Sequence, residues 1–148
     1  MVSFVANTSY HLQARLYFQG ALNVQALEDS LKEIVRRYEI CRTTFEEIEG
    51  QTVPVVHEHW LRKLSFADLS ALPSGQVSTI LANVAEDESY RLRDMTQLPL
   101  IRWTLLRLSC QCFVLLHVAH HRVDDVWPFS LFLDQLMDLY ESYTKVAC

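Results

Sequence analysis

Hydrophobic residues recur with two different periods along this chain, and the alternation of the two periods limits the folds it can adopt. From Tyr10 to Gln19 apolar and polar residues alternate, which indicates a half-buried strand. From Val24 to Tyr38 apolar residues instead recur every three or four positions, which indicates a helix with one buried face. Asn23 precedes this segment and is a residue type that caps helix N-termini.

The rest of the chain continues this interleaving of strand and helix patterns. Two further helices are predicted over 76–93 and 128–144, and four further strands over 43–48, 52–59, 100–108 and 112–117. The two strands around Glu49-Gly50-Gln51 carry a hairpin signal. Strands interleaved with three helices predict an α+β fold, in which helices pack on a mostly antiparallel sheet.

Composition narrows the class of protein and its surroundings. The chain has 148 residues, half of them hydrophobic and 21% charged, which fits one globular domain. The net charge of −5, without a basic stripe, argues against nucleic acid as a partner. No apolar stretch approaches the length of a membrane span, and Met1–Asn7 lacks the basic start of a signal peptide. We therefore expect a cytoplasmic protein that does not bind a membrane.

The cysteines do not indicate a metal or redox site. None of Cys41, Cys110, Cys112 and Cys148 forms a C-x-x-C pair. Reduced core cysteines are the expectation.

The stretch most suggestive of chemistry contains two adjacent histidines and two adjacent aspartates. His120-His121 and Asp124-Asp125 follow a predicted buried strand and precede a predicted helix, so we expect them in one short connection. Loops at strand ends are where a rigid scaffold presents reactive groups. A neutral imidazole can accept a proton from an attacking amine or hydroxyl, and a nearby carboxylate can fix its tautomer or hold the loop. A polar connection without chemistry is the alternative interpretation of such a loop.

A metal site is a weaker interpretation of the same residues. His117, His120 and His121, with Asp124 or Asp125, offer suitable ligand atoms. However, adjacent histidines diverge in an extended segment, and the spacing is not that of known zinc sites. No metal is therefore predicted. We interpret the pair His57 and His59, on one face of a predicted strand, as surface or packing residues.

Several segments resemble motifs of one family, in the family's order. Residues 120–126, HHRVDDV, resemble the HHxxxDG signature of the condensation domains of nonribosomal peptide synthetases, and Trp127 and the residues after it resemble the helix that follows. Three more matches lie upstream: 37–45 resembles the RHExLRTxF motif, 68–73 the DLSxLP connection, and 98–108 the PLLRxxLLRL strand. Together these matches extend over nearly the whole chain from Tyr10 to Tyr143.

The resemblance implies a fold and an activity. Condensation domains have two lobes, each similar to chloramphenicol acetyltransferase, and residues 1–148 would form the N-terminal lobe, a two-layer α/β sandwich, with the second lobe absent. Such domains join an acyl or peptidyl group on one carrier protein to an amine on another. Both groups ride on phosphopantetheine arms, and no other cofactor is implied.

The resemblance also implies roles for site residues. His121, with His120 beside it, would be the catalytic histidine, which positions or deprotonates the amine or stabilises the tetrahedral intermediate. Asp125 would be structural, through an ion pair with an arginine. Arg42 is one candidate for that arginine, and an arginine of the absent lobe is the other.

The chain departs from the family pattern at several positions. Val126 replaces the glycine of the signature, and a β-branched residue does not readily adopt positive φ or allow close backbone approach. Tyr38 and Cys41 replace the histidine and leucine of the second family motif, RHExLRTxF. Met1–Thr8 does not supply the family's opening Ser-x-x-Gln motif.

Three hypotheses follow. The chain is a catalytic lobe whose second lobe comes from a continuing polypeptide, another chain or a second copy of itself. Alternatively, it is a non-catalytic module that recruits a carrier protein or a partner enzyme. The third hypothesis is that the chain is a fragment, which would complement the missing part of the domain. Such a fragment would expose an inter-lobe face formed by Trp103, Trp127, Phe129 and 113–116, although each of these aromatics taken singly also fits ordinary core packing.

Overall fold

The computed structural model describes residues 11–58, 64–92, 96 and 100–146. The chain divides into two compact units, each assembled from separated segments. We call them the sheet unit (residues 1–22, 64–94 and 101–121) and the helical unit (residues 23–63, 95–100 and 122–148). That residues 1–148 form a single lobe stays a prediction.

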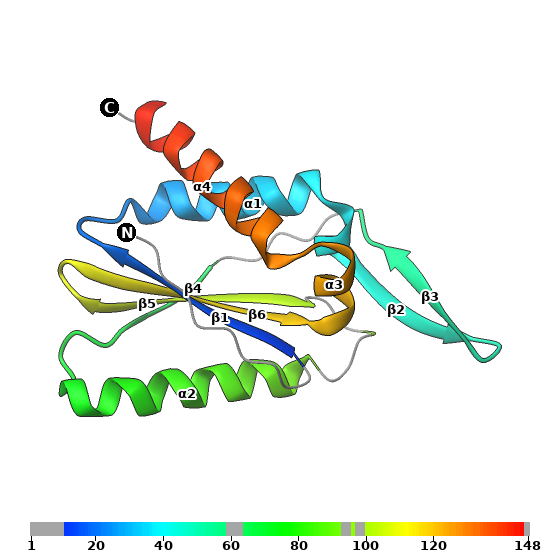
Figure 1. The fold of residues 1–148 in the computed structure, drawn as a ribbon, viewed down its shortest axis with the longest axis horizontal. Coiled ribbons are helices and arrows are strands. Elements are labelled where there is room, and N and C mark those ends of the chain that lie inside the picture. The colour runs from blue at the N-terminus through cyan, green and yellow to red at the C-terminus, as the bar shows by residue number, and fades with distance from the viewer. Residues whose placement is uncertain (1–10, 59–63, 93–95, 97–99, 147–148) are drawn as a thin grey trace. The chain divides into compact units, whose positions relative to one another are not determined.

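The sheet unit is built on a four-stranded sheet with one helix on it (Figure 1). The strand order is β1-β6-β5-β4, in which β6 pairs antiparallel with both β1 and β5, and β4 pairs parallel with β5. The predicted mostly antiparallel sheet is therefore confirmed. The elements are β1 (His11–Gln19), β4 (Ser65–Asp68), α2 (Ser74–Arg91), β5 (Ile101–Ser109) and β6 (Cys112–His120).

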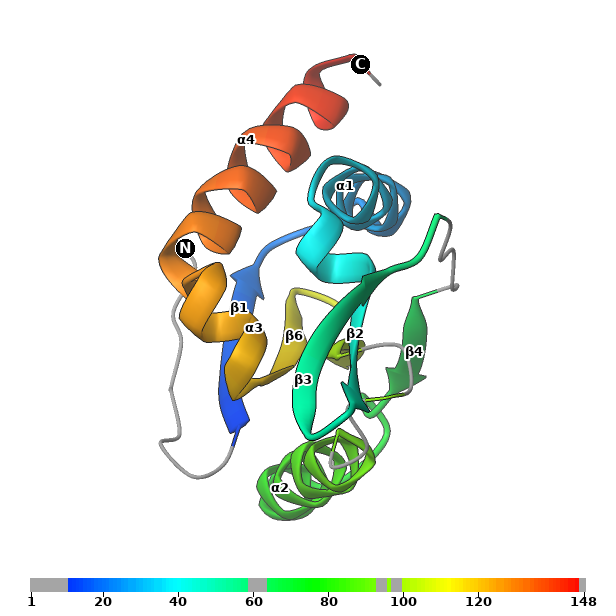
Figure 2. The same cartoon turned by 90° about the vertical axis from the view of Figure 1, so that its right-hand side faces the viewer.

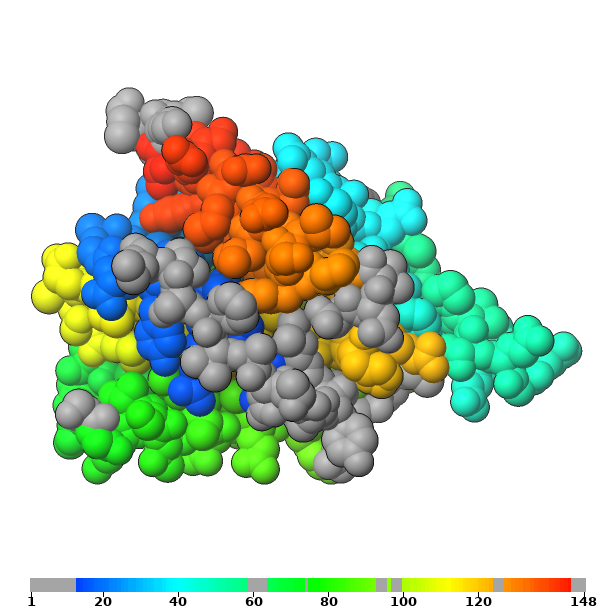
Figure 3. Space-filling model, in the orientation of Figure 1, coloured from blue at the N-terminus to red at the C-terminus, as the bar shows by residue number. Residues whose placement is uncertain are grey.

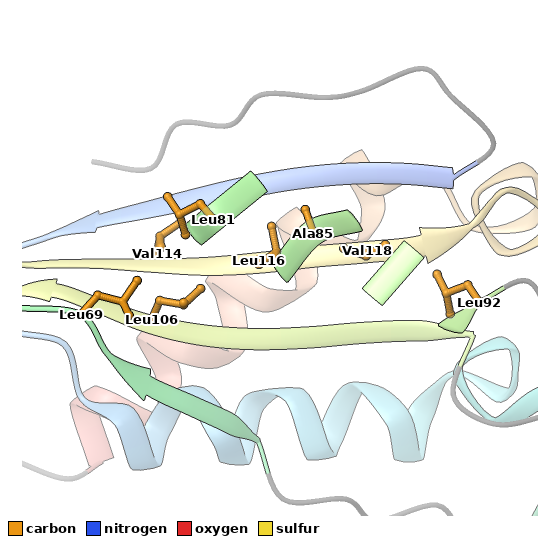
Figure 4. Close-up of a cluster of buried hydrophobic side chains, with 8 residues drawn as sticks. All are labelled: Leu69, Leu81, Ala85, Leu92, Leu106, Val114, Leu116 and Val118. Atoms are coloured by element: carbon orange, nitrogen blue, oxygen red, sulfur yellow. The ribbon is translucent and has the colours of Figure 1, made fainter. Parts of the chain in front are cut away.

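A hydrophobic cluster fixes α2 against the sheet (Figure 4). Three alternate residues of β6, Val114, Leu116 and Val118, contribute to it, because strand side chains alternate between the two faces. The cluster comprises Leu69, Leu81, Ala85, Leu92, Leu106, Val114, Leu116 and Val118, all at most 8% exposed. Next to it, the last turns of α2 make two polar contacts with the sheet, since Glu88 pairs with Arg102 and Ser89 Oγ accepts from Gln13 Nε2 at 2.8 Å.

The helical unit contains two long helices that pack side by side, α1 (Val24–Arg37) and α4 (Phe129–Val146) (Figure 2). α1 begins as predicted, because Asn23 Oδ1 accepts from the amide of Ala26 at 3.0 Å. Its buried face includes Leu27, Leu31 and Ile34. After α1 the short 3-10 helix η1 (Glu39–Arg42) leads into a hairpin.

The hairpin consists of β2 (Thr43–Ile48) and β3 (Gln51–Val56), and its turn lies at the surface in Figure 3. The two residues between the strands, Glu49 and Gly50, both have positive φ, 53° and 77°. Positive φ at both turn positions is the type I′ geometry that matches the twist of a two-residue hairpin. The predicted hairpin is confirmed, with its second strand beginning at Gln51.

Some expectations were wrong. Cys110 is exposed in the β5–β6 turn, whereas Cys41 is buried as expected, and burial raises the pKa of its thiol to about 12. Trp127 and Phe113–Leu116 are buried, so they do not form an exposed apolar face.

Among the described residues no helix is long and apolar enough to cross a membrane.

Candidate active site at the end of β6

The predicted connection between the strand and the long helix is shorter than expected and is mostly helical. β6 continues through His120, and α3 (His121–Val126) begins at the next residue. The strand is longer than predicted because β1 pairs with it to its end, where His11 lies opposite His120 in the register. A pairing partner so distant in sequence leaves no local signal.

The two adjacent histidines stack on each other. Their ring centroids lie 4.5 Å apart with an interplanar angle of 26°. The expectation that their side chains diverge was wrong, because it assumed an extended backbone at both residues, whereas His121 is already helical. His120 is 6% exposed and His121 is exposed. Of the pair, therefore, His121 is the one that is accessible from solvent.

A third histidine, His117, has a different environment. It lies three residues before His120 on β6, so the two point to opposite faces of the strand. His117 Nδ1 accepts from Trp103 Nε1 at 2.9 Å, across the β5–β6 pair. Burial lowers the pKa of His117 to about 3, so the ring is neutral with its proton on Nε2. His117 is thus a buried structural histidine, and its link to Trp103 could be predicted only from the strand register.

The motif aspartates lie on α3. Asp124, Asp125 and Val126 have helical backbone, but their side chains lie outside the described part of the structure. The structural role of Asp125 therefore stays a prediction. Helical backbone at Val126 does not require positive φ, so the loss of the signature glycine does not strain the chain at this position.

Arg42 supports the helical unit from within. Its Nε donates to the carbonyl of Val35 at 2.9 Å, and its Nη1 donates to that of His57 at 2.7 Å. Longer bonds reach the carbonyls of Glu58 (3.2 Å) and Arg36 (3.4 Å). The guanidinium thus joins the C-terminal end of α1 to the end of β3, a contact that sequence motifs did not predict. The proposed ion pair with Asp125 stays a prediction.

The remaining candidate ligands do not gather. His57 is half-buried and its Nε2 lies 2.8 Å from Thr44 Oγ1, which confirms a packing role, while His59 lies outside the described residues. Where side chains are described, no three His, Cys, Asp or Glu residues are placed to hold a metal ion.

Comparison with known proteins identifies the same family along almost the whole chain. The family model described as Condensation domain matches residues 3–146. One of the linear gramicidin synthase polypeptides of Brevibacillus parabrevis is 40% identical over 139 residues, which are 94% of this chain and 2% of that protein. Cyclosporin synthetase of Tolypocladium inflatum is 31% identical over 138 residues, 93% of this chain and 1% of that protein.

Solved structures agree on the fold. The SgcC5 protein from Streptomyces globisporus superposes with a TM-score of 0.78 at 23% identity, covering 92% of this chain and 31% of that one. The starter condensation domain of rhizomide synthetase gives 0.77 at 18% identity, covering 92% and 34%. The X-domain from teicoplanin biosynthesis gives 0.71 at 28% identity, covering 89% and 28%.

The chain spans a few per cent of the curated relatives and about a third of the solved domains. Within that span the predicted chloramphenicol acetyltransferase-like α+β fold is confirmed. The family match extends through both units and includes the stacked histidines, and the chain belongs to the condensation-domain family of nonribosomal peptide synthetases.

Proposed function

We propose that this chain is the histidine-bearing lobe of an amide-forming condensation domain, which joins an acyl or peptidyl group on one carrier protein to an amine on another. The observation that carries the proposal is the contrast within the stacked pair. His120 is buried at the end of the inner strand β6, and the exposed His121 begins α3 directly after it. An accessible imidazole backed by a buried one suits a group that must meet substrate in a fixed orientation.

The reaction would proceed by attack of the amine nitrogen on the thioester carbonyl. The C–N bond forms, the C–S bond breaks, and the phosphopantetheine thiolate leaves. His121 would accept the proton that the amine loses and return a proton to the thiolate. General acid–base catalysis of this kind contributes about 10²–10⁴ in rate.

The proposal requires a second lobe. The chain covers 28–34% of the solved relatives described above, and acyl transfer depends on positioning both substrates and excluding water. Light scattering over a range of concentrations separates the sources of that lobe. A stable dimer or trimer supports a second copy of this chain, and a monomer supports a continuing polypeptide or another protein.

A second candidate function is a module that binds a carrier protein or a partner enzyme without catalysing. It is favoured by Val126 at the position of the signature glycine, because a β-branched side chain there limits the close approach of a ligand to the backbone. In this alternative the phosphopantetheine-bearing carrier docks, but no bond forms.

One pair of measurements discriminates the two functions. A carrier protein bearing a phosphopantetheine arm is titrated into the chain and its His121→Ala variant by calorimetry. Amide product is measured in a chimera, in which this chain replaces the matched 139-residue segment of the linear gramicidin synthase polypeptide. Product that His121→Ala abolishes supports catalysis. Carrier binding that is equal in both proteins, with no product from either, supports the binding module.

A further inference from the structure

The short helix α3 is contacted near both ends by one segment of the helical unit. At its first turn, Arg122 Cζ lies 5.4 Å above the centre of the Phe45 ring. Just after its last residue, the Trp127 ring stacks on Tyr38 with centroids 4.8 Å apart and an interplanar angle of 26°. Tyr38 and Phe45 belong to the segment that resembles the second family motif. Two sequence motifs therefore meet at α3.

The segment that contacts α3 is itself well anchored. The amide of Tyr38 donates to the carbonyl of Ile34 at 3.0 Å, which ties it to the end of α1, and the carbonyl of Tyr38 accepts from the amide of Cys41 at 3.0 Å. Phe45 lies in β2, where it pairs with Pro54 of β3. The Arg42 bonds described above connect these two anchor points. Contacts made by this segment are thus made from a fixed base.

Trp127 is held from a second side as well. Its amide donates to the carbonyl of Val123 at 2.8 Å, which extends the hydrogen-bonding pattern of α3 by one residue. Its ring is 7% exposed and meets the edge of Phe132 of α4, with centroids 5.7 Å apart at 86°. Stacked and edge-to-face arrangements are the two favoured geometries of aromatic pairs. Trp127 therefore fixes the position at which α3 ends.

A helix of this length depends on such contacts. α3 has six residues, and helices shorter than about 12 residues are marginal in water by themselves. Its orientation is therefore set by packing. His121 is its first residue, so the backbone of His121 moves with the helix.

We propose that Tyr38 and Phe45 are positioning residues, which hold α3 near its two ends through Trp127 and Arg122 and thereby fix the backbone of His121. As far as it concerns His121, the proposal rests on the catalytic function proposed above. Neither residue touches the reacting atoms. Both act through the helix.

The first test measures the helix and needs no activity. The amide of Trp127 reports the end of α3, and its hydrogen exchange is followed by NMR in the wild-type chain and in variants. Tyr38→Ala and Phe45→Leu are expected to raise its exchange rate about tenfold, with amides of α1 and α4 unchanged. Tyr38→Phe keeps the stacked ring and serves as the matched control, with exchange at the wild-type rate. Unchanged exchange in Tyr38→Ala, or an equal rise throughout α1 and α4, would overturn the proposal.

The second test asks whether the helix positions His121. In the chimera described above, Tyr38→Ala is expected to lower kcat about tenfold with KM unchanged, and Tyr38→Phe to restore it. Faster Trp127 exchange with an unchanged kcat would overturn the positioning role. Turnover that survives His121→Ala would instead overturn the proposed function, which separates the two failures.

Discussion

The rings of His120 and His121 lie nearly parallel with their centres 4.5 Å apart, although one side chain is buried and the other is exposed. Neighbours in sequence can stack in this way only because the backbone changes from strand to helix between them. Because the backbone change leaves one ring buried and the other exposed, replacing the two histidines should have different effects.

Replacing the two histidines by alanine should affect stability unequally. His120→Ala removes a buried ring and is expected to lower the free energy of unfolding by roughly 1–3 kcal/mol. His121→Ala removes an exposed ring and is expected to leave the urea midpoint unchanged. Urea denaturation measures both variants. Equal destabilisation would contradict the difference in burial between His120 and His121.

The buried His117 should make stability depend on pH in a defined window. Its folded pKa is about 3, against an ordinary value of 6.5, so below pH 6.5 the unfolded chain takes up a proton that the folded chain does not. Stability therefore falls as the pH drops from 6.5 towards 3, by about 2 kcal/mol between pH 7 and pH 5. Urea midpoints at these two pH values measure the effect.

A matched variant isolates this contribution. His117→Gln keeps an acceptor for the Trp103 Nε1–H but does not titrate, so its stability should change less between pH 7 and pH 5 than that of the wild type. The other five histidines are common to both proteins. An identical pH dependence in the variant would assign the effect to those residues instead.

Arg42 should contribute to stability through its bonds to backbone carbonyls. Arg42→Ala is expected to lower the free energy of unfolding by about 2–3 kcal/mol, since hydrogen bonds to a charged group are worth about 1.5–3 kcal/mol and are not additive. Arg42→Lys should recover less than half, because an ammonium group cannot reproduce the fork of donors. Arg36→Ala is the control, because the Arg36 side chain is 70% exposed and its pair with Glu33 is a local one within α1, which is worth little.

The same experiment tests the predicted partner of Arg42. In a double-mutant cycle with Asp125→Ala, a coupling energy above about 1 kcal/mol would support the ion pair inferred from the family resemblance. Additive effects would leave Arg42 with the structural role that its carbonyl bonds describe.

The hairpin turn offers a stabilising change. Glu49 adopts a φ of 53°, which asparagine tolerates better than other non-glycine residues. Glu49→Asn is therefore expected to raise the free energy of unfolding by about 0.5 kcal/mol, which is observed as a higher melting temperature. Gly50→Ala should lower the free energy of unfolding by about 1 kcal/mol. A Cβ at this position has free space, but the φ of 77° is unfavourable for a residue with a side chain. A rise in melting temperature for Gly50→Ala would contradict the type I′ turn.

Local signals predicted much of this fold. Each correctly predicted element is encoded by residues close together in the sequence. These elements are α1 with its Asn23 cap, the Glu49-Gly50 turn, and the apolar strands β5 and β6. The four residues of β4 were missed, since Phe66 is 51% exposed and the strand exists only through its parallel pairing with β5, about 39 positions further on.

The sequence predicted the residues of the site but not the contacts between them. The motif located His120 and His121, but their stacking depends on where β6 ends, and that is decided by β1 across the sheet. The Trp103–His117 bond depends on strand register, and the contacts of Tyr38 and Phe45 with α3 join segments far apart in the sequence. Such pairs carry no periodicity from which they could be predicted.

The proposed role of His121 is tested by the rate of amide formation in a single turnover. The rate is measured for the chimera that contains this chain and for its His121→Ala variant, both with saturating loaded carrier proteins. His121→Ala is expected to lower the rate by at least about 100-fold, the lower end of general acid–base catalysis, while the protein remains folded. A folded His121→Ala chimera that forms the amide at the parent rate would contradict the claim that His121 acts in the reaction.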